Sequence, residues 1–218
     1  MVAHSTLREK PLGDGRLART IRTRGRIVDA MLSLVLEGHA NASLIEIAAR
    51  AEVTERTLFN HFPDISVAIA AALARSREMS QRLMPEVADH ADPVVGVLAW
   101  FDAAAPFYEL YSATRWAALV ARRPVPGFDA RQGKGLVLSR LEARVFELCG
   151  GIDPTLRADA RRRAALLTLI DPLAWRLLRV QQGLSPKKAS QAMACGVLAV
   201  CGEHSAAAPA RRKSRGTR

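Results

Sequence analysis

The stretch that decides the fold is IAARAEVTERTLFNHF, Ile47 to Phe62. Its apolar residues recur at helical spacing, stop near Glu52–Thr54 and then resume. On the second segment, four polar side chains fall within about 140° of arc, at about 100° of rotation per residue. They are Arg56, Thr57, Asn60 and His61, and Leu58 and Phe62 point the opposite way. The stretch therefore predicts two short helices joined by a tight turn, the second with a polar outer face.

The preceding residues predict another helix, and each of the two short helices has a defined start. A stripe at i, i+3, i+4 spacing, Ile27, Ala30, Met31, Leu34 and Val35, ends at Gly38, a helix-terminating glycine. In the SLIE segment, Ser43 and Glu46 form a capping box for the next helix. Thr54 caps the third helix. The side chains expected to pack inward there are Val53, Leu58, Phe59 and Phe62.

A polar second helix in a helix-turn-helix has the chemistry to read a DNA major groove. Arginine bonds guanine edges, asparagine bonds adenine edges, and threonine contacts a thymine methyl group or a phosphate. Helix starts also direct backbone N–H groups toward phosphates. The residues expected to bind DNA are Arg24, Ser43, Thr54, Arg56, Thr57, Asn60 and His61. The alternative is that this is the polar face of any amphipathic surface helix.

Composition favours an anionic partner. The 218 residues carry a formal net charge of +11, and 49% of them are hydrophobic, which excludes a disordered polypeptide. No apolar run approaches the roughly 20 residues that span a bilayer, and the N-terminus has no apolar segment suited to a signal peptide. Cys149, Cys195 and Cys201 have no metal-ligand spacing, and we expect buried thiols in a reducing cytoplasm.

The segment RGRIVDAMLSLVLEGHANASLIEIAARAEVTERTLFNHFPDISVAI, Arg24 to Ile69, resembles the TetR family of bacterial transcriptional repressors. The matching features are a first helix ending in EG, a Ser-capped second helix with IA, and the V-T-x-x-T-L-F-x-H-F pattern. LLTLIDPLAWRLLRVQQGLSPKKASQAM resembles the family's last two helices more loosely. The resemblance implies a dimeric repressor of double-stranded operator DNA, with a small-molecule effector in the larger domain.

Three residues depart from the family pattern. Glu52 stands where glycine is usual, at a turn that favours positive φ, which costs about 1 kcal/mol for other residues. Phe59 replaces a common tyrosine, and Ile65 replaces a lysine that often contacts phosphate. We expect an arginine-rich arm to supply phosphate contacts in their place, through Arg16, Arg19, Arg22, Arg24 and Arg26. The alternative is a solvated basic tail.

The rest of the chain also predicts helices, so the fold class is all-α. A capping residue followed by proline marks three helix starts, at Asp92-Pro93, Asp153-Pro154 and Ser185-Pro186. The expected division is a basic, disordered arm at 1–20, the helix-turn-helix domain at 21–65, a helical ligand-binding and dimerisation domain at 66–203, and a basic disordered tail at 204–218.

Aromatic residues gather in WFDAAAPFYELYSATRW and predict either plain core packing or a ligand cavity. Asp171 is the one charge in an apolar run, and Pro172 predicts a kink or a helix restart with Asp171 as its cap. The other hypothesis is that Asp171 binds a polar group of a ligand or an arginine such as Arg115. The candidate ligand-binding residues are Trp100, Phe107, Tyr108, Tyr111, Arg115, Trp116, Asp171 and Trp175.

Two apolar stripes near the C-terminus predict a four-helix dimer interface around a two-fold axis. One comprises Leu166, Leu169, Ile170, Leu173 and Leu177; the other comprises Ala189, Ala192, Met193, Gly196, Val197 and Val200. The alternative is that both stripes pack inside the monomer.

The sequence strings that resemble enzyme motifs lack the context that those motifs need. GDGRLA, Gly13 to Ala18, fits a dinucleotide-binding string, but no strand precedes it, and the histidines have no zinc spacing. We therefore expect no catalytic residues, no metal and no cofactor. Two functions stay open: a repressor released by an apolar or aromatic ligand, or a basic DNA-binding dimer with no effector. A deep cavity in the larger domain would favour the first.

Overall fold

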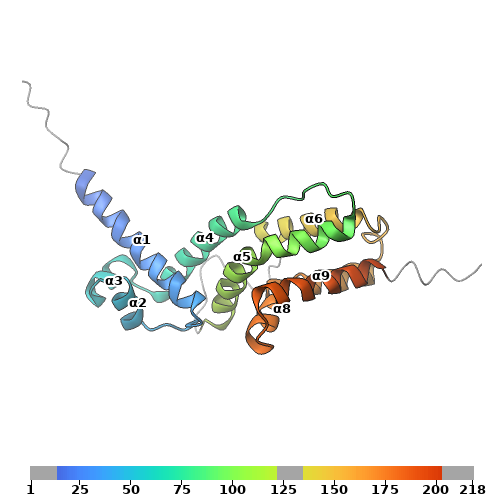
Figure 1. The fold of residues 1–218 in the computed structure, drawn as a ribbon. Helices are drawn as coiled ribbons and strands as arrows, with labels where there is room; N and C mark the ends of the chain where they lie inside the picture. Colours follow the sequence, from blue (N-terminus) through green and yellow to red (C-terminus); the bar gives the residue numbers. More distant parts are fainter. Residues whose placement is uncertain (1–13, 122–134, 203–218) are drawn as a thin grey trace, which may run out of the picture.

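The computed structural model describes residues 14–121 and 135–202, and every regular element in these two ranges is a helix (Figure 1). This confirms the all-α prediction. The elements are α1 (Asp14–Leu36), α2 (Leu44–Arg50), α3 (Glu55–His61), α4 (Ile65–Leu83), α5 (Pro93–Val120), α6 (Leu136–Gly150), α7 (Ala160–Leu169), α8 (Pro172–Arg176), the π-helical turn η1 (Leu177–Gln181) and α9 (Pro186–Gly202). The tail predicted at 204–218 lies outside the described residues.

The helix-turn-helix forms where the sequence predicts it. Ser43 caps α2 through the full capping box: its Oγ accepts from the Glu46 N–H at 3.2 Å, and the Glu46 carboxylate accepts from the Ser43 N–H at 2.8 Å. Thr54 caps α3 by accepting from the Thr57 N–H at 3.1 Å. A shared core joins the first four helices: Ile27, Met31, Leu34, Ile47, Leu58, Phe62, Ala68 and Ala72.

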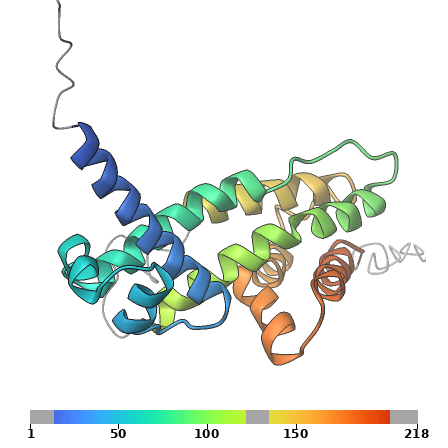
Figure 2. The same cartoon turned by 60° about the vertical axis from the view of Figure 1, so that its left-hand side comes forward.

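Helix α1 begins at Asp14, so residues 14–20 are helical, although we expected a disordered arm there. The two halves of α1 have different surroundings, and this explains the difference. Its second half is buried against α2 and α4, and that packing stabilises a helix that continues beyond the core. The first half projects away from the rest of the molecule in both views, with Leu17 and Ile21 60% and 63% exposed (Figures 1 and 2).

The larger part of the fold is built around α5, which packs against α4, α6, α8 and α9. Buried side chains from α5, α6, α7, α8 and α9 form one cluster, which includes Phe101, Tyr108, Leu141, Trp175 and Val197. Among residues 14–121 and 135–202, no single helix is long and apolar enough to cross a membrane. Helices α3 and α4 are long and apolar enough only when taken together, and they are bent by 72° relative to each other.

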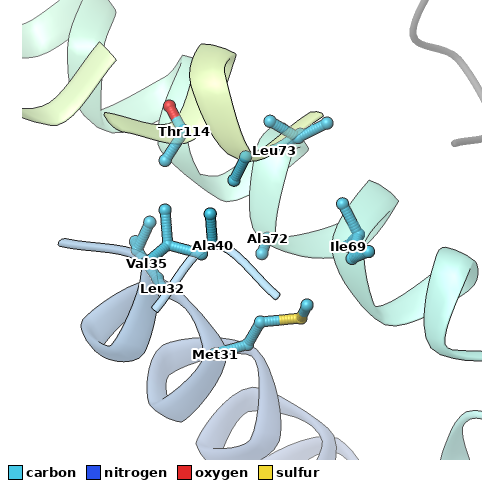
Figure 3. A pocket seen from close by; sticks show the side chains of 9 residues that line it. Met31, Leu32, Val35, Ala40, Ile69, Ala72, Leu73 and Thr114 are labelled. Atoms are coloured by element: carbon cyan, nitrogen blue, oxygen red, sulfur yellow. The ribbon is translucent and has the colours of Figure 1, made fainter. Parts of the chain in front are cut away.

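Helix α4 belongs to both parts of the molecule. Its first turns place Ala68 and Ala72 in the core of the helix-turn-helix, and further along the Oγ of Ser76 hydrogen-bonds to Oγ1 of Thr114 on α5 at 2.8 Å. Where α1, α4 and α5 meet, the side chains leave a hollow of only about 10 Å³ (Figure 3). The predicted boundary at residue 65 therefore falls at the first turn of a helix that continues without a break.

Of the three predicted helix starts with a cap followed by proline, two are confirmed and one is wrong. Helices α5 and α9 begin at Pro93 and Pro186. At Pro172, where the sequence left a kink and a helix restart open, the chain restarts as α8. Pro154 instead lies in a turn, and α7 begins at Ala160 with Asp159 as its cap. The Asp153 carboxylate accepts from the Thr155 N–H at 2.9 Å but also pairs with Arg162, a distant partner that the local pattern did not include.

Candidate nucleic-acid interface

Helix α3 has the two-sided arrangement that its sequence predicts. Leu58 and Phe62 are buried, while Arg56 and Asn60 extend to solvent. The other two members of the predicted polar face, Thr57 and His61, are half-buried. Arg56 and Asn60 lie one turn apart, so their side chains reach out from the same face of the helix.

Phe59 does not pack inward, and this part of the prediction is wrong. Its side chain is 45% exposed. Leu58 and Phe62 already fill the inward side of α3, and Phe59 follows Leu58 by about 100° of rotation. It borders an open hollow of about 430 Å³ together with Asn41, Pro63 and Ile65.

The turn between α2 and α3 is held by an arginine of α1. Glu52 has a φ of 51°, which is the positive φ that the resemblance to the TetR pattern predicted for this position. The Arg26 guanidinium donates to the carbonyl oxygens of Ala51 and Glu52 at 2.6 and 3.2 Å, and it lies 3.0 Å from the Glu52 carboxylate. Arg26 therefore supports the turn.

Arg24 likewise supports the C-terminal end of α3. Its guanidinium donates to the carbonyl oxygen of His61 at 2.8 Å and lies 4.1 Å from the centroid of the Phe62 ring. The Arg24 side chain is nevertheless exposed, so its predicted contact with DNA stays a prediction. Arg16, Arg19 and Arg22, on the projecting half of α1, remain exposed.

A bidentate ion pair fixes α2 against α1. The Arg50 guanidinium donates to the two carboxylate oxygens of Glu37 at 2.6 and 2.7 Å, and also to the Ser33 hydroxyl at 2.9 Å. The hydrogen bond from Arg50, assisted by one from Ser33, lowers the pKa of Glu37 to about 2. The orientation of α2 thus depends on a carboxylate that stays charged at neutral pH.

In the larger domain, the aromatic residues pack on one another. Tyr108 stacks on Trp175 with ring centroids 5.2 Å apart, and Phe107 stacks on Tyr111 at 5.7 Å. The Tyr108 hydroxyl donates to the Ile170 carbonyl at 3.2 Å, and burial raises its pKa well above the usual value. A cavity lined by these rings, as one prediction had it, is not what the described residues form. Phe107, Tyr108 and Trp175 are core.

Two other tryptophans also have structural contacts. Trp100 is buried, and its indole N–H donates to the Pro85 carbonyl at 3.2 Å. Trp116 is 38% exposed, with the Arg176 guanidinium 5.1 Å from its ring centroid.

An open groove lies beside the kink at Asp171. It measures about 470 Å³ and is lined by Arg115, Leu138, Glu142, Leu167, Thr168, Asp171, Leu173, Ala174 and Leu177. Asp171 has both expected roles: one carboxylate oxygen accepts from the Leu173 N–H at 2.8 Å as the cap of α8, and the other lies 3.7 Å from the Arg115 guanidinium. Of the predicted ligand-binding residues, the groove brings together Arg115 and Asp171.

Much of the predicted dimer seam is core. Leu166, Ile170, Ala189, Met193 and Val197 are buried within the monomer. Gly196 allows a close helix approach, but the neighbour is Leu169 of the same chain, which a Cβ at this position would meet at 3.3 Å. The members that remain exposed or half-buried are Leu173, Leu177, Ala192, Gly196 and Val200.

The geometry defines a class of fold: an N-terminal helix-turn-helix joined by a continuous helix to a larger helical domain. The chain is similar to a solved structure of a transcriptional regulator from Rhodococcus sp. Rha1, with a TM-score of 0.58 and 20% sequence identity over 81% of this chain and 95% of that one. No family model matches the chain. A search of curated proteins finds no match. Within 14–121 and 135–202, no group of three or more His, Cys, Asp or Glu side chains could hold a metal ion.

Proposed function

We propose that this chain is a DNA-binding transcriptional regulator that acts as a repressor. The observation that carries the proposal is the exposed face of α3, where Arg56 and Asn60 extend from a helix fixed at both ends. Their side chains have the donors and acceptors that read guanine and adenine edges in a major groove. The resemblance to the TetR family and the fold of the Rhodococcus regulator support the same reading.

Electrostatics add support for a nucleic-acid partner. The chain carries a net charge of +11. The projecting half of α1 adds three exposed arginines, Arg16, Arg19 and Arg22, to the same end of the molecule as α2 and α3 (Figure 1). A helix in that position can place them along the phosphates of the duplex that α3 reads.

We also infer that the groove at Arg115 and Asp171 receives the effector, a small and largely apolar molecule. Four of the nine residues that line the groove are leucines, and the charged groups of Arg115, Glu142 and Asp171 can orient a polar end of the ligand. Binding would release DNA by favouring an arrangement in which the two recognition helices of a dimer no longer match successive major grooves, about 34–36 Å apart.

The second candidate is a DNA-binding dimer without an effector. The packing of Phe107, Tyr108 and Trp175 favours it, because the centre of the larger domain is filled by stacked rings. The open groove favours the ligand-responsive repressor.

The decisive experiment selects binding sites from random duplex DNA with the full-length protein, then measures variants on the selected site. Arg56→Ala and Asn60→Ala should each weaken specific binding by about 1–3 kcal/mol, because each removes a bond to a base edge. Arg82→Ala is the matched control, since it removes the same charge from an exposed position near the far end of α4.

The control should lose little specific affinity. If wild-type protein selects no sequence, or if both α3 variants bind the selected site as wild type does, α3 does not read DNA and the proposal falls.

A further inference from the structure

The outer side of α3 is only in part the polar face that the sequence predicts. The exposed residues of this helix are Glu55, Arg56, Phe59 and Asn60. At about 100° of rotation per residue, these side chains lie within about 140° of arc. In that arc Phe59 lies between Glu55 and Arg56. An aromatic ring therefore shares the outer face of α3 with the two side chains that we propose to read bases.

The side chain of Thr57, by contrast, is turned toward the start of α3. Thr57 is half-buried, and its hydroxyl shares a hydrogen bond of 2.9 Å with the hydroxyl of Thr54. Its backbone N–H donates to the same Thr54 hydroxyl at 3.1 Å. Thr57 thus takes part in the cap of the helix, although the sequence predicts that it contacts a thymine methyl group or a phosphate. The apolar side chain on the outer face of α3 is that of Phe59.

The ring of Phe59 can offer a DNA duplex only apolar contact. It is 45% exposed, because Leu58 and Phe62 fill the inward side of α3. It also lacks the hydroxyl group with which a tyrosine at this position could bond a phosphate. Among the base edges in a major groove, thymine carries an apolar group, the C5-methyl, and phenylalanine is one of the side chains that contact it.

We propose that Phe59 reads a thymine of the operator by packing its ring on the C5-methyl group. This inference rests on the proposed function, because it requires α3 to lie in the major groove. With a rise of about 1.5 Å per residue, Phe59 lies about 4.5 Å along the helix axis from Arg56 and about 1.5 Å from Asn60. Base pairs are stacked about 3.4 Å apart. The thymine therefore lies within about two base pairs of the bases that Arg56 and Asn60 read.

The test first changes the DNA, so the folded protein stays as it is. Full-length protein selects a site from random duplex DNA, and each thymine of that site is replaced in turn by deoxyuridine, which pairs with adenine but lacks the methyl group. We expect one such replacement per half-site to weaken wild-type binding about fourfold, as the loss of one buried methyl group should. That thymine should lie within about two base pairs of the positions where Arg56→Ala and Asn60→Ala lose specificity.

A protein variant then assigns the methyl effect to the ring. Phe59→Ala should bind the thymine site roughly tenfold more weakly than wild type, and deoxyuridine at the sensitive position should weaken it no further. Leu83→Ala is the matched control, because it removes a 38% exposed apolar side chain at the far end of α4. It should keep both the wild-type affinity and the fourfold effect of deoxyuridine.

Three results would overturn the proposal: a selected site with no thymine near the bases read by Arg56 and Asn60, wild-type binding that tolerates deoxyuridine at every thymine, or a methyl effect that persists in Phe59→Ala. In each of them Arg56 and Asn60 can still discriminate bases, so the proposed function stands without this contact. Failure of the wild-type protein to select any sequence removes the contact and the proposed function together.

Discussion

Glu52 has a backbone conformation that side chains other than glycine seldom adopt, with φ of 51°. Glu52→Gly should remove the steric cost of this conformation, while Glu52→Ala keeps it. Both variants lose the exposed ion pair with Arg26, so their comparison isolates the backbone. We expect Glu52→Gly to be more stable than Glu52→Ala by about 1 kcal/mol in urea unfolding. Equal stabilities would show that the turn relaxes to accommodate a side chain.

The pair of Glu37 and Arg50 predicts a pH dependence. The pKa of Glu37 is lowered from 4.5 to about 2 in the folded protein. Its contribution to stability is therefore fully present above pH 4.5 and is lost as the pH falls toward 2. Glu37→Gln should be less stable than wild type at pH 7, and the difference should shrink between these two values.

Urea unfolding at several pH values measures this difference. Arg50→Gln is the matched variant, because it removes the partner and leaves the carboxylate. It should abolish the same part of the pH dependence. A constant gap between wild type and Glu37→Gln down to the lower pH would contradict the prediction.

At the scale of the element, the sequence predicts helix starts best where the cap and its helix are adjacent. Ser43, Thr54 and Asp171 each accept a hydrogen bond from a backbone N–H two or three residues later, so the pattern contains the whole interaction. Asp153 shows the limit: its carboxylate also pairs with Arg162, and no local pattern shows such a partner. The π-helical turn η1 likewise has no local signal that we recognised.

The cap of α8 can be tested apart from its ion pair. Asp171→Asn keeps a side-chain oxygen that can accept from the Leu173 N–H, but it loses the charge opposite Arg115. Asp171→Ala loses both. We expect Asp171→Ala to be less stable than Asp171→Asn by about 1 kcal/mol, which is the typical contribution of an N-cap. Thermal or urea unfolding measures the difference. If the two variants unfold together, the cap contributes nothing measurable to α8.

At the scale of the whole molecule, periodicity predicts that a helical face is buried but not what covers it. The stripe containing Met193 and Val197 was correctly read as an apolar seam, but its neighbours are in the same chain. The aromatic cluster is similar: composition cannot distinguish rings around a cavity from rings stacked on each other. The side chains of α3 could be placed because the helix is short and one of its faces is filled by two large residues.

The proposed dimer makes a prediction about the face of α9 that remains exposed. Ala192→Arg places a long charged side chain on that face and should convert a dimer to monomers in analytical ultracentrifugation at micromolar concentration. Ala143→Arg is the matched control, because it makes the same change at an exposed position of α6. A monomeric wild type would remove the dimer from the proposed function, and a dimeric Ala192→Arg would move the interface elsewhere.

Helix α4 runs uninterrupted from the core of the helix-turn-helix to the contact between Ser76 and Thr114. A gene fragment that stops at residue 65 would therefore encode a helix-turn-helix whose core lacks Ala68 and Ala72. A protease acting on the native protein finds no exposed connector between the two parts before the segment that follows Leu83. The helix-turn-helix domain therefore cannot be moved to another protein by cutting the chain at the predicted boundary, because side chains of α4 beyond that boundary complete its core.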